Sequence, residues 1–223
     1  MNKILFFNPR SAKYKPRIPN SILSVAGAVE GLYDYAIVDG NLETDPAEKI
    51  FKYLKTGQFK YFGCTCMPGP QLKEAIPISK RIREEFPGIK IIWGGYFPSN
   101  QSKVVLDSGF VDFIINGPGE KSFPLLLNAL EQNAPHQNIS NLIFKEVNTV
   151  IKTKRDELYD MDALPSLPYE KLNMFYPLQR YLGKTYLGTK TIAYHSSMGC
   201  PFTCSYGWSL ICKLTSQSLP VYL

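Results

Sequence analysis

Two cysteines near the end of the chain have a spacing that suits iron–sulfur chemistry. Cys200 and Cys204 stand in the stretch GCPFTCSYG, with three residues between them. Thiolates bind iron clusters because soft sulfur suits iron, and a short loop brings several sulfurs to one point. In the spacing CxxxCxxC the third ligand would fall at Gly207, which has no side chain, and Cys212 is a less regular substitute. The residues alone leave three hypotheses open: a metal site, the remains of one, or two unrelated thiols.

The other residues that could do chemistry form no second site. Cys64 and Cys66 alternate along an apolar run, which favours small core residues over ligands. His136 is expected at the surface, in a polar linker. His195, five residues before Cys200, is expected on a strand with its hydrogen bonds satisfied rather than as a metal ligand. The sequence contains no hydrolase triad and no glycine-rich nucleotide motif, which argues against common dinucleotide or nucleoside triphosphate sites.

Composition indicates an ordinary globular protein. The 223 residues are 44% hydrophobic and 20% charged, and the net charge is +6. The basic N-terminal residues are few and are not interleaved with aromatics, so the sequence predicts no nucleic-acid binding. No apolar run approaches a membrane span, and five cysteines without a signal peptide predict reduced thiols in a cytoplasmic setting.

Residues 1–135 alternate strand-like and helix-like segments. The apolar runs that predict strands are Lys3–Asn8, Tyr35–Gly40, Tyr61–Cys66, Lys90–Gly95 and Val111–Gly117. The helical patterns are Asn20–Gly31, Asp45–Gly57, Pro70–Gly88 with Pro77 expected to kink or shorten it, and Gly119–Asn133. This alternation predicts an α/β domain with a doubly wound parallel sheet of flavodoxin-like order.

The character of the sequence changes after Pro135. Residues 136–188 predict a β-hairpin over Ser140–Lys154, with Val147–Asn148 near its turn, and then an ordered, proline-rich linker. Residues 189–223 begin with a predicted strand, Thr189–Ser197, that leads into the cysteine segment.

Ligands of open parallel sheets bind beyond the carboxyl ends of the strands. Four of the five loops expected at that edge contain glycine, which lets the backbone approach a ligand closely. The loop GPGE also runs into a helix start, where free N–H groups favour an anion or a polar rim. This edge is therefore the expected binding site.

Two parts of the sequence resemble one enzyme family. The stretches GPQLKEAIPISKRIREEFPGIKIIWGGYFPS and VDFIINGPGEKSF resemble the cobalamin-binding domain that precedes many radical S-adenosylmethionine barrels. The stretch SSMGCPFTCSY resembles the first strand and cluster loop of such a barrel, and the hairpin and linker resemble the connection between the two. The resemblance covers nearly all of residues 1–206.

The resemblance implies a cobalamin, a [4Fe-4S] cluster and S-adenosylmethionine as cofactors. It implies reductive cleavage of S-adenosylmethionine, then radical methyl transfer or a related reaction on an unknown small molecule. Carried over by position, the residues that would line the corrinoid are Asn8, Pro9, Arg10, Gly69, Pro70, Gln71, Gly94, Gly95, Gly117, Gly119 and Glu120. Cys200 and Cys204 would ligate iron, and Tyr206 would flank the adenosyl site through its backbone.

Three departures from the family pattern shape the expectation. No Asp-x-His-x-x-Gly motif follows the first strand, so a corrinoid would bind without its histidine. Gly207 replaces a cluster cysteine, and a barrel needs about 200 residues or more. We therefore expect a truncated or frame-shifted reading past Tyr206 and a catalytically incomplete chain. The alternative is a non-catalytic flavodoxin-like binding or regulatory module with incidental cysteines. The sequence does not indicate an oligomeric state.

Overall fold

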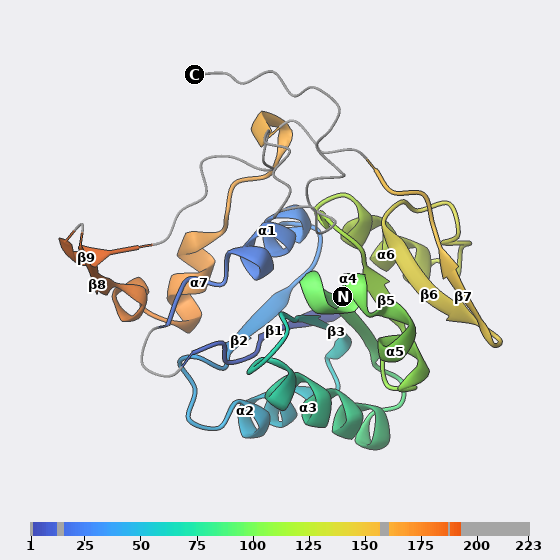
Figure 1. Cartoon of the computed structure of the whole chain (residues 1–223), viewed down its shortest axis with the longest axis horizontal. Helices are drawn as coiled ribbons and strands as arrows, with labels where there is room; N and C mark the ends of the chain where they lie inside the picture. Colours follow the sequence, from blue (N-terminus) through green and yellow to red (C-terminus); the bar gives the residue numbers. More distant parts are fainter. Residues whose placement is uncertain (1, 13–15, 157–160, 187, 193–223) are drawn as a thin grey trace, which may run out of the picture. The chain divides into compact units, whose positions relative to one another are not determined.

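The computed structural model describes residues 2–12, 16–156, 161–186 and 188–192. Within them the main sheet has the strand order β2-β1-β3-β4-β5-β6-β7 (Figure 1). Its first five strands are parallel: β1 Lys3–Asn8, β2 Tyr35–Asp39, β3 Phe59–Thr65, β4 Lys90–Gly94 and β5 Phe113–Ile115. The direction of winding reverses between β1 and β3, which confirms the predicted doubly wound, flavodoxin-like order.

Helices cover both faces of the sheet. On one face lie α2 (Pro46–Leu54), α3 (Leu72–Glu85) and α5 (Ser102–Asp107); on the other lie α1 (Asn20–Val29), α6 (Ser122–Glu131) and α7 (Tyr169–Phe175). Each face has its own buried apolar cluster, so the strands carry hydrophobic residues on both sides. A short helix, α4 (Tyr96–Asn100), follows β4.

Two details of the helices test the sequence predictions. Asp45 caps α2 as predicted, because its carboxylate accepts a 2.9 Å hydrogen bond from the backbone N–H of Glu48. Pro77 does not shorten α3, since the helix continues to Glu85, and the alternative of a kink at Pro77 stays a prediction. Pro77 is exposed, so water can replace the backbone donor that proline lacks.

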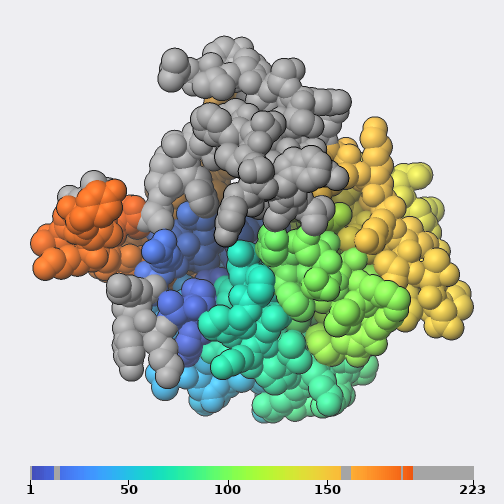
Figure 2. Space-filling view, viewed as in Figure 1, coloured from blue at the N-terminus to red at the C-terminus, as the bar shows by residue number. Residues whose placement is uncertain are grey.

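The predicted hairpin is confirmed, and it extends the main sheet. β6 (Leu142–Glu146) pairs antiparallel with β5, and β7 (Thr149–Lys152) pairs antiparallel with β6. β7 therefore runs in the same direction as β5. In the space-filling view this gold segment lies beside the green segment that carries β5 and α5 (Figure 2).

The turn of this hairpin holds a strained residue. Val147 has φ 53° and a side chain that is 97% exposed, although left-handed backbone is unfavourable for a β-branched residue. Val147→Gly is expected to raise the free energy of unfolding by about 1 kcal/mol, because glycine relieves the strain without losing a buried contact. Urea unfolding checks this, with Val147→Asn expected between the two; an unchanged or lower stability would contradict the prediction.

The remaining described elements come after β7, and most of them lie in the predicted proline-rich linker. They are η1 (Met161–Ala163), η2 (Leu178–Tyr181) and a separate two-stranded ladder of β8 (Gly183–Thr185) and β9 (Gly188–Thr191). β9 covers Thr189–Thr191 of the predicted strand Thr189–Ser197 and ends before Ile192, while residues 193–197 lie outside the described residues. In the part of the chain that the structure describes, no helix is long and apolar enough to cross a membrane.

Candidate functional site

The loops after β1 and β3 are joined by buried amide side chains. Asn8 donates from Nδ2 to Asp39 Oδ1 at 2.9 Å. Gln71 donates from Nε2 to the carbonyl of Pro9 at 2.9 Å, and its Oε1 accepts from the N–H of Met67 at 2.7 Å. Asn8 and Gln71 are both buried, so these two predicted corrinoid residues use their side chains to hold the loops together.

Arg10 is also engaged within the protein. Its Nε donates to Glu74 Oε1 at 3.0 Å, and its Nη2 donates to the carbonyl of Glu43 at 2.7 Å. The backbone N–H of Arg10 donates to the second oxygen of Glu74 at 2.8 Å. The positive charge of Arg10 is therefore neutralised by Glu74 of α3.

A fully buried carboxylate lies at the end of β2. Asp39 Oδ1 accepts hydrogen bonds from Asn8 and Asn41, and Oδ2 accepts one from the hydroxyl of Tyr181 at 2.8 Å. Burial raises the pKa of Asp39, and the bonds from Asn41, Tyr181 and Asn8 oppose that shift. Tyr176 joins the same cluster: it accepts from the N–H of Asp39 and donates to Glu43.

The pair of glycines after β4 has a demanding geometry. Gly95 has φ 96°, and a Cβ there would lie 2.8 Å from the carbonyl oxygen of Cys66. Among the described residues, a Cβ at Gly94 would meet only the Cβ of Ile115, at 4.0 Å. The loop after β4 therefore lies tightly against the loop after β3, whereas the described residues leave the Cβ position of Gly94 uncrowded.

The loop after β3 contributes two exposed residues from the predicted set. Gly69 has φ 98°, and no atom of the described residues lies within 4 Å of its Cβ position. Pro70 is likewise exposed.

Hydroxyl groups of α1 face the same edge. Ser21 donates to Thr65 Oγ1 at 3.2 Å, and Ser24 donates to Glu120 Oε1. Ser21 and Ser24 are three residues apart, so they share one side of α1. Glu120 is 9% exposed, yet its Oε2 has no hydrogen-bond partner within the described residues. The sequence analysis identified Glu120 but missed the hydroxyls of Ser21, Ser24 and Thr65. The signal for the two serines is their spacing of three residues at a helix start.

The loop after β5 packs closely on its neighbours. A Cβ at Gly119 would lie 3.1 Å from Val25 of α1 and 3.3 Å from Ile115. Gly117 is exposed with φ 116°, a conformation that glycine adopts freely. Gly94, Gly119 and Glu120 thus come together near Ile115, on the face of the sheet covered by α1 and α6.

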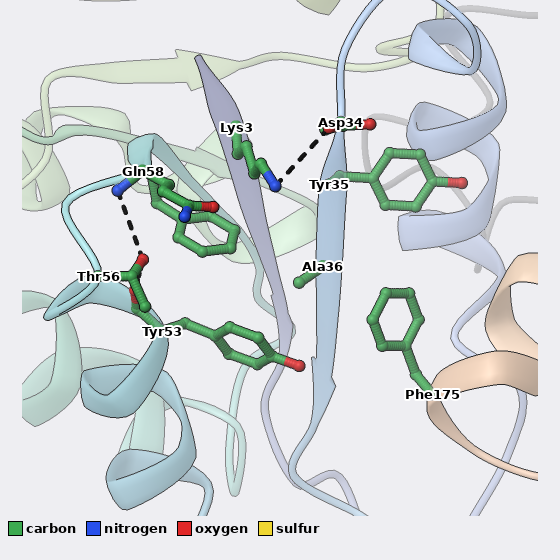
Figure 3. A pocket seen from close by; sticks show the side chains of 9 residues that line it. Lys3, Asp34, Tyr35, Ala36, Tyr53, Thr56, Gln58 and Phe175 are labelled. Carbon is green, nitrogen blue, oxygen red and sulfur yellow. Dashed lines mark hydrogen bonds and ion pairs between the residues drawn. The ribbon is translucent and has the colours of Figure 1, made fainter. Parts of the chain in front are cut away.

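A shallow pocket of about 390 Å³ lies at the opposite ends of the strands (Figure 3). Lys3 and Asp34 form an ion pair at 3.7 Å beside it, and Tyr53 and Phe175 flank Ala36 from the two faces of the sheet. Parallel sheets bind ligands at their carboxyl ends, so this pocket is not the candidate cofactor site.

The remaining predicted residues divide into two groups. Cys64 and Cys66 are buried free thiols, as predicted for core residues. His136 is half-buried rather than a simple surface residue, because its ring packs on Phe113 and Phe144. Within the described ranges no His, Cys, Asp and Glu side chains form a group able to hold a metal. His195, Cys200, Cys204, Tyr206, Gly207 and Cys212 lie outside the described residues.

Known proteins are similar to this chain in sequence. The profile of the B12 binding domain matches residues 16–127, just over half of the 223 residues. An anaerobic magnesium-protoporphyrin IX monomethyl ester cyclase of Synechocystis is 25% identical over 92% of this chain and 42% of its own length. An uncharacterised methyltransferase of Pyrococcus horikoshii is 23% identical over 84% of this chain and 40% of its own. The chain thus spans about two fifths of these curated relatives.

Solved structures share the fold. The cobalamin-dependent S-adenosylmethionine radical enzyme OxsB, with aqua-cobalamin and S-adenosylmethionine bound, superposes with a TM-score of 0.67 at 18% identity, over 78% of this chain and 25% of that one. The radical S-adenosylmethionine methyltransferase TsrM of Kitasatospora setae gives 0.61 at 18% identity, over 69% and 30%. These likenesses, and above all the family match over half of the residues, favour a cobalamin-binding domain over a generic flavodoxin-like module. The chain belongs to the B12 binding domain family, and it resembles the cobalamin-binding part of radical S-adenosylmethionine enzymes.

Proposed function

We propose that this chain binds a corrinoid at the carboxyl ends of β1 to β5 and presents it to radical S-adenosylmethionine chemistry. The observation that carries the proposal is the geometry after β4. Gly95 allows a backbone approach that no other residue could make without strain, and Gly94 leaves space beside Ile115. The family match covers these residues, and the fold is that of two cobalamin-dependent radical enzymes.

The residues at this edge fit a corrinoid, which carries many amide groups. Glu120 Oε2 is a buried acceptor without a partner among the described residues, and an amide N–H of a ligand would satisfy it. The hydroxyls of Ser21 and Ser24 lie on the same side of α1 and can donate or accept. In this proposal Gly94, Gly95, Gly119 and Glu120 line the corrinoid on the α1 side.

The other predicted residues take a supporting part in the proposal. Asn8, Arg10 and Gln71 would shape the loops after β1 and β3, with Pro9 between them, because their side chains bond within the protein. Gly69, Pro70 and Gly117 would complete the rim with exposed backbone. The loop between β1 and α1 contains no histidine, so cobalt would take no histidine ligand from that loop.

The radical part of the proposal concerns the cysteine segment. Cys200 and Cys204 would supply two thiolates to a [4Fe-4S] cluster, and the backbone of Tyr206 would flank S-adenosylmethionine. A bound corrinoid supplies a cobalt centre that can carry a methyl group. The relatives include a cyclase and a methyltransferase, so the substrate class is a small organic molecule that undergoes radical methylation or a related reaction.

Anaerobic reconstitution with hydroxocobalamin, followed by absorbance of the desalted full chain, tests the proposal. We expect the wild type to retain corrinoid and Gly94→Leu to bind it at least about tenfold more weakly, because leucine fills the space beside Ile115. Gly88→Leu is the matched control, since Gly88 also has open space but precedes β4 at the opposite edge. Iron and sulfide quantification of the same samples reports the cluster. A wild type without corrinoid, or a Gly94→Leu variant that binds like the wild type, would contradict the proposal.

A further inference from the structure

One buried asparagine organises the end of β5. Asn141 is 1% exposed and has φ 61°, a left-handed conformation that asparagine tolerates better than most residues. Its carbonyl oxygen accepts from the N–H of Asn116 at 2.7 Å, and its Nδ2 donates to the carbonyl of Pro118 at 3.3 Å. Asn141 therefore holds the loop after β5 from both sides of Gly117.

The same asparagine also holds the segment after β7. The N–H of Asn141 donates to the carbonyl of Lys154 at 2.9 Å, and its Oδ1 accepts from the N–H of Asp156 at 2.9 Å. Because β7 runs parallel to β5, this segment lies at the same edge as the loop after β5. Asn141 thus fixes the residue between Lys154 and Asp156 against that loop.

That residue is Arg155, and its guanidinium lies over Gly117. The Cβ position of Gly117 is 3.3 Å from Nη2 and 3.5 Å from Nε of Arg155. Gly117 has no side chain, and its φ of 116° discourages one, so the guanidinium can approach the backbone closely. Arg155 is therefore placed by the fold, at the carboxyl edge of the sheet.

Among the described residues, Arg155 has no ion-pair partner. Arg10, Arg81 and Arg83 each form an ion pair with a carboxylate. Arg155 is half-buried but forms no ion pair or hydrogen bond among the described residues. Burial lowers the pKa of Arg155, because the charged form loses part of its water. A cation in this state is stabilised by an incoming anion.

We propose that Arg155 binds an anionic oxygen group, a phosphate or a carboxylate, of a molecule held at this edge. A guanidinium presents paired N–H donors that match the two oxygens of either group. The inference rests on the proposed function, which places a corrinoid at the same edge. The anion is either the phosphodiester in the nucleotide loop of that corrinoid or an anionic group of a separate small ligand.

The test compares Arg155→Gln and Arg155→Lys with the wild-type full chain. Hydroxocobalamin carries the phosphodiester, whereas cobinamide lacks the nucleotide loop, and both are titrated by absorbance. Inorganic phosphate and acetate are titrated by calorimetry as the simplest separate anions. Lys152→Gln is the control for general charge, because Lys152 is an exposed cation on β7 of the same hairpin.

Two results support the inference. If the phosphodiester is the anion, Arg155→Gln weakens hydroxocobalamin binding about tenfold and leaves cobinamide unchanged. If a separate ligand supplies the anion, Arg155→Gln abolishes phosphate or acetate binding and leaves both corrinoids unchanged. In either case Arg155→Lys retains part of the binding and Lys152→Gln retains all of it.

Three results overturn the inference. Arg155→Gln leaves the binding of every ligand unchanged, it weakens the binding of both corrinoids equally, or its effect on binding is no greater than that of Lys152→Gln. The failure of the proposed function looks different. In that case the wild type binds no corrinoid at all, and the phosphate and acetate titrations alone decide the role of Arg155.

Discussion

Replacing Asp39 with alanine is expected to lower the free energy of unfolding by about 3–5 kcal/mol. Asp39 is fully buried, and the change removes the acceptor of bonds from Asn8, Asn41 and Tyr181. Tyr181 is itself only 3% exposed, so its hydroxyl would lose its partner without gaining water. Urea unfolding followed by circular dichroism measures the effect.

Two further variants separate the causes. Tyr181→Phe removes a single bond to Asp39 and is expected to cost about 1–2 kcal/mol. Asp39→Asn keeps an oxygen for Asn8 and Asn41, and its amide can donate to the hydroxyl of Tyr181, so most stability should remain. An alanine variant as stable as the asparagine variant would show that the buried bonds contribute little.

The pH dependence of stability, compared between the wild type and Asp39→Asn, gives an independent check on the environment of Asp39. The pKa of Asp39 is raised in the folded state. As the pH rises above about 4, the carboxyl of Asp39 therefore ionises in the unfolded chain before it ionises in the folded protein. The contribution of Asp39 is therefore complete below that pH and declines as the pH rises through the folded pKa. The stability of the wild type relative to Asp39→Asn should fall with rising pH. A difference that stays constant or grows would contradict the raised pKa.

Gly95→Ala is expected to destabilise the fold by about 3 kcal/mol, and Gly69→Ala by only about 1 kcal/mol. Both glycines have a left-handed backbone, with φ of 96° and 98°. They differ in surroundings, because a methyl group at Gly95 would lie 2.8 Å from the oxygen and 3.0 Å from the nitrogen of Cys66, whereas Gly69 has open space.

The comparison isolates the steric cost of the close approach after β4 from the conformational cost that both positions share. Chemical denaturation of the two variants under one set of conditions measures each loss. Equal losses would mean that the loop after β4 moves away from Cys66 readily, and that Gly95 is needed only for its backbone angle.

Much of the fold follows from the sequence because its signals are local. The buried strands are continuous apolar runs, and β1 coincides with the predicted Lys3–Asn8. The cap of α2 at Asp45 was predicted for the same reason. The helices α4, α5 and α7 were missed because segments of five to seven residues are too short to display a helical repeat, and α4 also contains a proline, Pro98.

The site was predicted less completely because its contacts are distant in sequence. The glycines after β4 and β5 were found from their position at strand ends, and they stay a prediction for corrinoid contact. Tyr176 and Tyr181 reach Asp39 across more than 130 residues, and no spacing rule connects them. Arg155 was missed similarly, since the pairing of β6 with β7 and the bonds of Asn141 bring it to Gly117 across 38 residues of sequence.

The hairpin of β6 and β7 also sets where the chain leaves the sheet. β6 runs opposite to β5 and β7 runs opposite to β6, so β7 ends at the same edge of the sheet as β5. A single added strand would have released it at the opposite edge, beside Lys3 and the start of β1. With an even number of strands, the residues after Lys152 depart from the rim of the proposed cofactor site.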